Sequence, residues 1–256
     1  MNKINHAIIS FDEGSTYADL WPYVSRCWLE VCGIKAIAFV VSDESSDFVE
    51  DEFGLIKKVK AEEGFPISIQ SQLLRLYCYK YFLDTELSCI ISDADMLPIN
   101  SNFINSGVSY YKENCIVSYY RHLIGNEERE LAMCYNMSKV CTFIKILNLN
   151  KFKTFKDFLS FLSVKYKAEY ETKNSHKQKF GWNIDQRYMW DCMQNNKELF
   201  ITPTPPFDLI RLDRGRWPDL KDEDIINHRY NDCHFFNDGL NNDRVNLLNK
   251  LINLSK

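Results

Sequence analysis

Short apolar segments alternate with helix-like segments in the first hundred residues, and this order restricts the possible folds more than any other feature. Four apolar segments have the length and β-branched composition of buried strands: residues 7–11, 34–41, 56–59 and 87–92. Apolar side chains recur at helical spacing in residues 20–31 and 67–82, and Gly33 follows the first of these where glycine often ends a helix. This β-α-β-α-β order implies a mostly parallel sheet with helices on both faces.

The second half of the chain is less regular. Residues 115–120 are typical of a strand, 131–146 mix strand and helix patterns, and 148–170 show helical apolar spacing. Residues 165–179 are polar and charged, as in a solvated loop or in a mobile lid over a site. Because no repeat or clear linker divides the chain, we expect a single α/β domain over residues 1–256, with a Rossmann-like central sheet flanked by helices.

Composition limits the class of function. The formal net charge of -4 argues against a general nucleic-acid binder. The nine cysteines include no C-x-x-C pair, which favours buried thiols in a reducing compartment. No apolar run approaches the ~20 residues of a membrane span, and the first residues lack a signal-peptide pattern. We therefore expect a soluble, cytoplasmic protein.

Asp93 and Asp95 directly follow the last of the four apolar segments. Ligands of open α/β sheets bind beyond the carboxyl ends of parallel strands. Mn²⁺ and Mg²⁺ prefer oxygen ligands, often a few carboxylates together with substrate phosphates, and stabilise a departing diphosphate. An Asp-Ala-Asp turn can also simply cap a helix. The position after a buried strand favours the metal interpretation.

Residues 91–96, Ile-Ser-Asp-Ala-Asp-Met, resemble the D-x-D segment of GT-A glycosyltransferases, which use nucleotide-sugar donors. Residues 72–77 are similar to a helix that brings an arginine to the donor in several such families. Residues 184–186 are similar to an Asp-Gln element beside the transferred sugar, and 225–230 to a segment that supplies a histidine to the metal. Some large DNA viruses encode single-domain, soluble sugar transferases of this kind.

The resemblance covers residues from about 6 to 235 and has two departures. The glycines that often follow the Asn of the acceptor segment are missing from residues 134–138. No Lys-Pro-Trp follows His228, as it does in one retaining family. The resemblance therefore indicates the superfamily and not a family. It implies that residues 4–100 bind the nucleotide sugar and that residues 101–256 form the acceptor side.

The resemblance also implies a bound Mn²⁺ or Mg²⁺. The expected metal ligands are Asp95, Asp93 and a histidine, either His228 or His234, although each histidine can equally be an ordinary surface residue. Asp95 is the principal expected ligand. Asp93 contacts the ribose, a metal-bound water or the ion in this interpretation.

Donor contacts are expected from strand ends and from one helix. Arg75 can form a bidentate contact with phosphate or can lie at the surface with its stem buried. Asp12 and Asp43 follow the first two strands and can accept hydrogen bonds from the base or ribose. The expected donor-binding set is Phe11, Asp12, Asp43, Arg75, Asp93, Ala94 and Gln186.

Asp185 stands where a helix can begin. It is a candidate general base for the acceptor hydroxyl, a partner of donor sugar hydroxyls, or only a helix cap. Two further groups each allow two interpretations. Three tryptophans can stack against sugars or pack in the core: Trp182, Trp190 and Trp217. Three arginines can contact the diphosphate or lie in a solvated loop: Arg211, Arg214 and Arg216.

The expected activity is metal-dependent transfer of a hexose from a nucleoside diphosphate sugar, with a UDP-sugar favoured, to a hydroxyl of a glycan or small acceptor. Two alternatives are a sugar-phosphate nucleotidyltransferase and a non-catalytic nucleotide-sugar-binding module. The first is disfavoured because residues 11–16 contain one glycine and no basic residue, whereas such enzymes carry a glycine-rich basic loop there. The module would bind donor without turnover.

Overall fold

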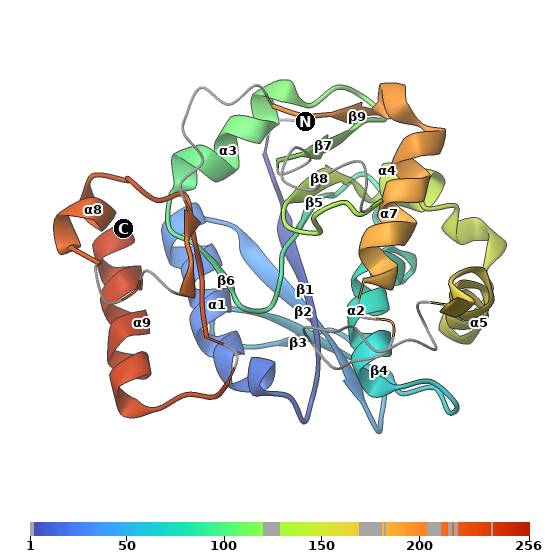
Figure 1. The fold of residues 1–256 in the computed structure, drawn as a ribbon, viewed down its shortest axis with the longest axis horizontal. Helices are drawn as coiled ribbons and strands as arrows, with labels where there is room; N and C mark the ends of the chain where they lie inside the picture. Colours follow the sequence, from blue (N-terminus) through green and yellow to red (C-terminus); the bar gives the residue numbers. More distant parts are fainter. Residues whose placement is uncertain are drawn as a thin grey trace.

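The computed structural model describes residues 3–119, 129–168, 181, 183–203, 211–214, 217, 220–236 and 238–256. Its main sheet has the strand order β3-β4-β2-β1-β5-β8-β7-β9 (Figure 1). The strands are, in chain order, β1 (His6–Asp12), β2 (Lys35–Ser42), β3 (Val49–Glu50), β4 (Gly54–Lys60), β5 (Ser88–Ile91), β7 (Ile116–Ser118), β8 (Asn136–Lys139) and β9 (Phe200–Ile201).

Four neighbouring parallel strands form the centre of this sheet. β1 pairs in parallel with β2 and with β5, and β2 pairs in parallel with β4. These are the four strands predicted from the apolar segments, and the predicted α/β class with a mostly parallel central sheet is confirmed. On one side of the centre β3 is antiparallel to β4, and on the other side β8 is antiparallel to β5 and β7.

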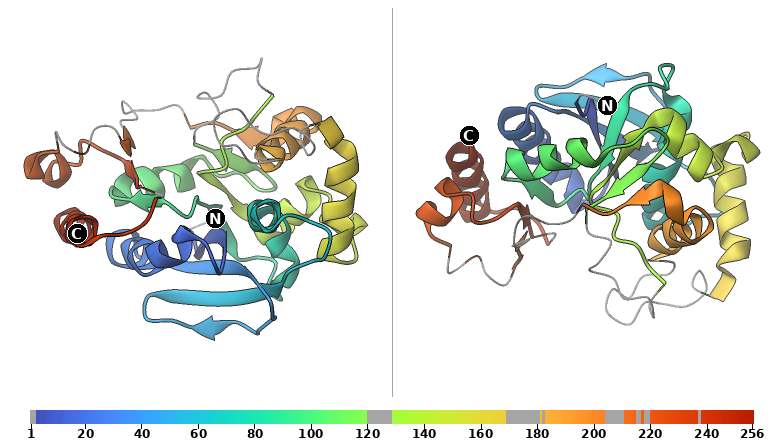
Figure 2. Two further views of the ribbon diagram at one scale, coloured as in Figure 1. Left: turned by 60° about the horizontal axis from the view of Figure 1, so that its bottom comes forward. Right: turned by 90° about the horizontal axis from the view of Figure 1, so that it is seen from above.

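Helices cover both faces of the sheet (Figures 1 and 2). They are α1 (Thr16–Cys32), α2 (Ile67–Tyr77), α3 (Ser101–Tyr110), α4 (Val140–Ile146), α5 (Phe155–Lys165), α7 (Ile184–Asn195), α8 (Asp222–Ile226) and α9 (Asn242–Ser255), with short 3₁₀ helices η1 (Cys78–Tyr81), η3 (Leu149–Lys151) and η4 (Lys197–Leu199).

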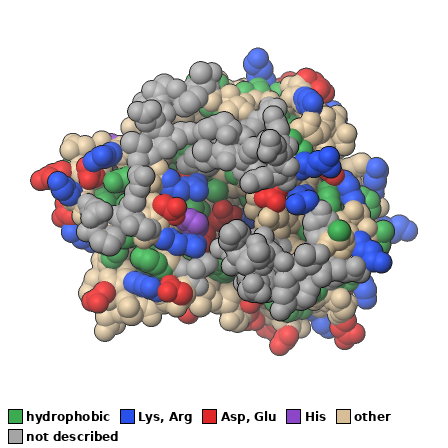
Figure 3. Space-filling view, viewed as in Figure 1, with side chains coloured by type: hydrophobic (Ala, Val, Ile, Leu, Met, Phe, Trp, Pro, Cys, Tyr) green, Lys and Arg blue, Asp and Glu red, His purple; other side chains and the backbone are tan. Residues whose placement is uncertain are grey.

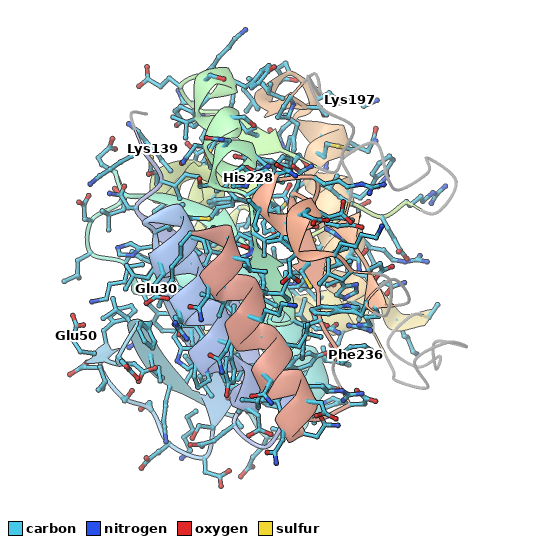
Figure 4. The ribbon with its side chains drawn as sticks, turned by 90° about the vertical axis from the view of Figure 1, so that its left-hand side faces the viewer. Glu30, Glu50, Lys139, Lys197, His228 and Phe236 are labelled. Atoms are coloured by element: carbon cyan, nitrogen blue, oxygen red, sulfur yellow. The ribbon has the colours of Figure 1, made fainter. Side chains whose placement is uncertain are left out.

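Alternate side chains of the central strands divide between two hydrophobic cores. In β2, Ala38 and Val40 pack into the core under α1 and α9, whereas Ile37 and Phe39 pack into the core under α2, α5 and α7. Figure 4 shows α9 lying along α1. Because both faces are buried, the strands read in the sequence as continuous apolar segments.

The predicted C-terminal end of the first helix agrees with its local capping, although α1 begins at Thr16, four residues before the predicted start. α1 ends at Gly33, whose φ of 68° is left-handed and favours glycine, and the Ile34 N–H donates to the Trp28 carbonyl at 3.0 Å. The predicted helix over 67–82 is α2 continued by η1. In the second half, the strand predicted over 115–120 is β7, and the helical pattern of 148–170 forms η3 and α5. The possible lid lies largely outside the described residues, since 169–180 are not described.

A second sheet joins the middle of the chain to its C-terminal part. It consists of β6 (Met96–Pro98), β11 (Asp232–His234) and β10 (Arg211–Leu212), and the sequence did not predict it. β6 follows the acidic pair directly and is antiparallel to β11, with Met96 opposite His234. This register brings a C-terminal histidine to the acidic pair.

None of the helices in the described ranges combines the length and the apolarity that crossing a lipid bilayer requires.

Gly107→Ala tests the packing of α3. Helix propensity alone would stabilise this variant by up to about 1 kcal/mol. We expect instead a loss of about 1–3 kcal/mol, because the added Cβ would overlap the ring of Tyr119. That ring is buried, and its hydroxyl donates to the Ile104 carbonyl. Urea denaturation measures the difference.

Gly14→Ala is the matched control, since the nearest atom to its Cβ would be 4.0 Å away. Its free energy of unfolding should change by no more than ~0.5 kcal/mol. A stabilised Gly107→Ala variant would contradict the described packing of α3.

Candidate active site

A cavity of about 440 Å³ lies at the carboxyl end of the central strands. Its walls come from the end of β1, the start of α1, one side of α2, residues 93–95, and three residues distant in sequence: Gln186, Arg214 and His234. Acidic, basic and histidine side chains meet near the middle of this face of the molecule (Figure 3). The position agrees with the general placement of ligands in open α/β sheets.

Most of the residues singled out from the sequence line this cavity. They are Phe11, Asp12, Arg75, Asp93, Ala94, Asp95, Gln186, Arg214 and His234. Sequence reasoning missed the polar side chains that complete the wall: Ser10, Ser15, Thr16, Tyr17, Ser68, Ser71 and Gln72. Ser10 could have been predicted from its position near the end of a strand. The lining residues of α2 could not, because they depend on which side of that helix faces the sheet.

Three predicted residues lie outside the cavity: Asp43, His228 and Asp185, of which Asp185 is described below. Asp43 is exposed beyond the end of β2. His228 is exposed as well, in the turn after α8, where its φ of 51° lies in the left-handed region and its N–H donates to the Ile225 carbonyl at 2.9 Å. Figure 4 shows His228 well apart from Phe236 along the C-terminal segment. Of the two candidate histidines, the structure therefore brings His234, and not His228, to the acidic pair.

The chain turns sharply at the acidic pair. The Ser92 N–H still donates to the Ile8 carbonyl of β1 at 2.9 Å, so the ladder of the central sheet continues to this residue. The Met96 N–H then donates to the Asp93 carbonyl at 3.2 Å, and the Phe235 N–H donates to the Asp95 carbonyl at 2.8 Å. The two sheets therefore hold the backbone on both sides of the pair.

Asp95 and His234 face each other, with Arg214 against both. The Asp95 Oδ2 and His234 Nε2 atoms are 3.4 Å apart. Arg214 Nη2 donates to Asp95 Oδ2 and lies 2.8 Å from His234 Nε2. On the far side of the ring, His234 Nδ1 lies 3.1 Å from an Asp213 carboxylate oxygen.

These contacts determine the tautomer of the neutral His234 ring. A guanidinium can only donate, so Nε2 offers Arg214 its lone pair while Nδ1–H donates to Asp213. Burial alone would lower the pKa of His234, but the hydrogen bond and charge of Asp95 outweigh it, so that this pKa is raised. Above that pKa, Nε2 carries a lone pair that accepts from Arg214, and a metal ligand requires such a lone pair.

Arg75 is held by two carboxylates. Its Nε donates to Asp185 Oδ2 at 2.9 Å, its Nη2 donates to the same oxygen, and its Nη1 donates to Asp93 Oδ1. Burial by itself would lower the pKa of Arg75, but the two carboxylates raise it. Burial by itself would raise the pKa of Asp93, but the charge of Arg75 holds it below the ordinary value.

The expected role of Asp185 as a general base needs correction. Its side chain is fully buried beneath Arg75 and is not part of the cavity wall. Arg75 binds one carboxylate oxygen, and the Gln186 N–H donates to the other at 2.8 Å. Burial raises the pKa of this carboxyl, although the Arg75 charge opposes the shift. In the described part of the chain, the Asp185 carboxylate therefore holds Arg75 and the Gln186 N–H and does not face the cavity.

The structure places the predicted tryptophans and arginines in different surroundings. Trp190 and Trp217 are buried in the two cores, and Trp217 packs edge-on against Phe235 at 4.9 Å between ring centroids. Arg211 pairs with Asp232 at 3.0 Å, and only Arg214 of the described arginines in that group reaches the cavity. Trp182 and Arg216 lie outside the described residues.

The donor atoms fit a divalent ion in part. Among the residues that the structure describes, no three His, Cys, Asp or Glu side chains converge as a formed metal site. Asp95 and His234 nevertheless present one carboxylate oxygen and one imidazole nitrogen to the same point, and Asp213 supplies the carboxylate that often orients a ligating histidine. One or two protein ligands completed by phosphates are typical of Mg²⁺ sites.

Solved glycosyltransferase structures share this architecture. GlyE from Streptococcus pneumoniae TIGR4, in its apo form, has a TM-score of 0.53 at 9% identity over 98% of this chain and 60% of its own. Apo WbbM, a bifunctional glycosyltransferase, has a TM-score of 0.52 at 10% identity over 100% of this chain and 50% of its own. An active-site mutant of LgtC has a TM-score of 0.50 at 10% identity over 97% of this chain and 95% of its own.

The chain therefore has the GT-A fold of glycosyltransferases, which the sequence resemblance predicted. It spans only part of GlyE and of WbbM. No protein-family model and no curated protein sequence matches the chain.

Arg75→Met tests the buried ion pair. Removing the guanidinium leaves the Asp185 charge buried without compensation, and we expect a loss of about 3–5 kcal/mol in the free energy of unfolding. The double variant Arg75→Met/Asp185→Leu should recover much of this loss. Lys139→Met is the control, because it breaks an exposed pair with Glu86 and should change the free energy of unfolding far less than Arg75→Met.

The loss in Arg75→Met should also depend on pH. Without Arg75, the raised pKa of Asp185 lets the folded state keep a proton that the unfolded state has released, so stability falls as the pH rises. Urea denaturation at pH 5 and pH 8 measures this difference. An equal loss at both values would contradict the buried position of Asp185.

Proposed function

We propose that the protein is a metal-dependent glycosyltransferase that transfers a hexose from a nucleoside diphosphate sugar, with a UDP-sugar favoured, to a hydroxyl of a glycan or small acceptor. One observation carries the proposal: Asp95 Oδ2 and His234 Nε2 face each other at 3.4 Å in a cavity beyond the parallel strands of a GT-A fold. Arg75 and Arg214 add positive charge to the same cavity.

Asp95 and His234 would hold the divalent ion, Mn²⁺ or Mg²⁺, together with the donor phosphates. When bound, such an ion supplies Lewis-acid stabilisation of the departing diphosphate. The orientation of His234 by Asp213 supports this role, because the ring needs no tautomer change to act as a ligand. Asp93 is bonded to Arg75, so its proposed role is at the ribose or at a metal-bound water.

Arg75 is proposed to contact the donor phosphates. A guanidinium remains charged at all ordinary pH values, and its fork suits phosphate oxygens. Asp185 fixes Arg75 from the buried side, which leaves little side-chain freedom to lose on binding. Asp12, at the end of β1, and Phe11 are proposed to bind the nucleoside.

Gln186 is proposed to contact the transferred sugar. Its side chain lines the cavity, and its backbone is fixed on both sides: its N–H donates to Asp185, and its carbonyl accepts from the Leu131 N–H at 3.2 Å. Fixed groups of this kind select sugar hydroxyls by geometry. Since Asp185 is buried, no general base is assigned to the acceptor.

A non-catalytic nucleotide-sugar-binding module is the second candidate. The pairing of Asp93 and Asp95 with arginines favours it, because both carboxylates already have a cationic partner within the protein. Such a module would bind donor with no release of sugar. Measuring hydrolysis of the donor in the presence of Mn²⁺ separates the two candidates.

Ligand-induced stabilisation tests the donor class. We expect UDP with Mn²⁺ to raise the melting temperature more than UDP or Mn²⁺ alone, because a ligand that binds only the folded state stabilises it by mass action. A panel of nucleoside diphosphates, each with and without Mn²⁺, identifies the preferred base by thermal shift. No shift with any member of the panel would contradict the proposal.

Asp95→Asn tests the metal role directly. The substitution keeps the size of the side chain but removes its charge, so metal-dependent hydrolysis of the UDP-sugar should fall by about 10²-fold or more. Asp43→Asn is the matched control, because Asp43 is exposed outside the cavity, and its rate should stay within twofold of the wild type. Unchanged hydrolysis in Asp95→Asn would exclude Asp95 from the mechanism.

A further inference from the structure

Arg214 lies at the point on which Asp95 and His234 converge. Its Nη2 donates to Asp95 Oδ2 and lies 2.8 Å from His234 Nε2, while its Nε donates to the Phe235 carbonyl at 2.6 Å. The guanidinium thus donates to both Asp95 Oδ2 and His234 Nε2, which are 3.4 Å apart. It is the cation that these two groups hold in the structure.

A divalent ion bound by the same pair would need an oxygen of Asp95 and the single lone pair of His234 Nε2. His234 Nε2 cannot ligate an ion while it accepts from Arg214, since the ion and Nη2 would have to occupy one position. Two positive charges at this separation also repel strongly in a partly buried site. Arg214 and the ion are therefore alternative occupants of one anionic site.

The two cavity arginines are anchored differently. Arg75 has its own fully buried carboxylate, Asp185, and keeps it whether or not Asp93 is engaged. Arg214 has a neutral anchor, the Phe235 carbonyl, in addition to Asp95 and His234. If Arg214 moves away from Asp95, its guanidinium loses a negatively charged partner. A nearby diphosphate would supply another.

We propose, on the basis of the proposed function, that Arg214 is a resident counter-ion that competes with the divalent ion for Asp95 and His234. The ion then binds weakly by itself. It binds tightly together with a nucleoside diphosphate, because the phosphates supply further ligands to the ion and accept the displaced guanidinium. Arg214 in this way couples metal binding to donor binding.

Mn²⁺ binding in the absence of nucleotide tests the competition. Arg214→Met should bind Mn²⁺ alone about tenfold more tightly than the wild type or better, because a charge-assisted hydrogen bond no longer has to be broken. Arg214→Gln removes the charge while keeping a donor for the Phe235 carbonyl, and should behave in the same way. Isothermal titration calorimetry measures the affinities, and thermal melting verifies that each variant is folded.

Arg229→Met is the matched control, since it also removes one positive charge but from an exposed pair with Asp224. Its affinity for Mn²⁺ should stay within about twofold of the wild type, because exposed charges are screened by salt. In the presence of UDP, the affinity for Mn²⁺ should rise by a larger factor in the wild type than in Arg214→Met, because only the wild type has a guanidinium to transfer to the phosphates.

The outcomes are distinguishable. Equal Mn²⁺ affinity in the wild type, Arg214→Met and Arg214→Gln would overturn the competition while leaving the proposed metal-dependent function intact. An equal effect of UDP on Mn²⁺ affinity in the wild type and Arg214→Met would overturn the coupling. If no variant binds Mn²⁺ with or without UDP, the proposed metal dependence fails, and the role of Arg214 fails with it.

Discussion

The antiparallel pairing of β6 with β11 sets Met96 opposite His234, and the candidate site depends on this register. Because Asp95 directly precedes Met96, the pairing brings residues 139 positions apart in sequence to a separation of 3.4 Å (234 minus 95 gives this interval). A shift of one residue would turn His234 to the opposite face of the strand. The central sheet supplies the other half of the constraint, since β5 delivers the acidic pair to the edge where the cavity lies.

Charge compensation explains how so many ionisable groups share this region. Arg75 pairs with both Asp93 and Asp185, and Arg214 pairs with Asp95. A buried charge without a partner is costly, so these carboxylates require a neighbouring cation, and Asp93 and Asp185 share one arginine. The two arginines differ in that Arg75 is fixed from beneath and Arg214 is not. This difference suits Arg75 to a permanent contact with phosphate and Arg214 to the role of an exchangeable cation.

The sequence predicted the first hundred residues well because their signals are local. Continuous apolar segments, helical spacing and Gly33 each depend on near neighbours, and the strand-end position of Asp93 and Asp95 follows from them. The assignments of Asp185 and His228 depended on resemblance alone. The burial of Asp185 depends on which face α7 turns toward α2, and a local sequence pattern does not determine this. The small sheet that brings His234 to the site consists of strands of two and three residues. Strands of that length carry too little pattern to be recognised.

We propose that Asp95 and His234 form the metal-binding pair and that Arg214 leaves them when the ion binds with donor. Anomalous scattering from crystals grown with Mn²⁺ and UDP tests it most directly. We expect one manganese peak ligated by Asp95 and His234, with Arg214 turned from both toward the diphosphate. Manganese bound elsewhere, or UDP bound while Arg214 still bridges Asp95 and His234, would contradict it.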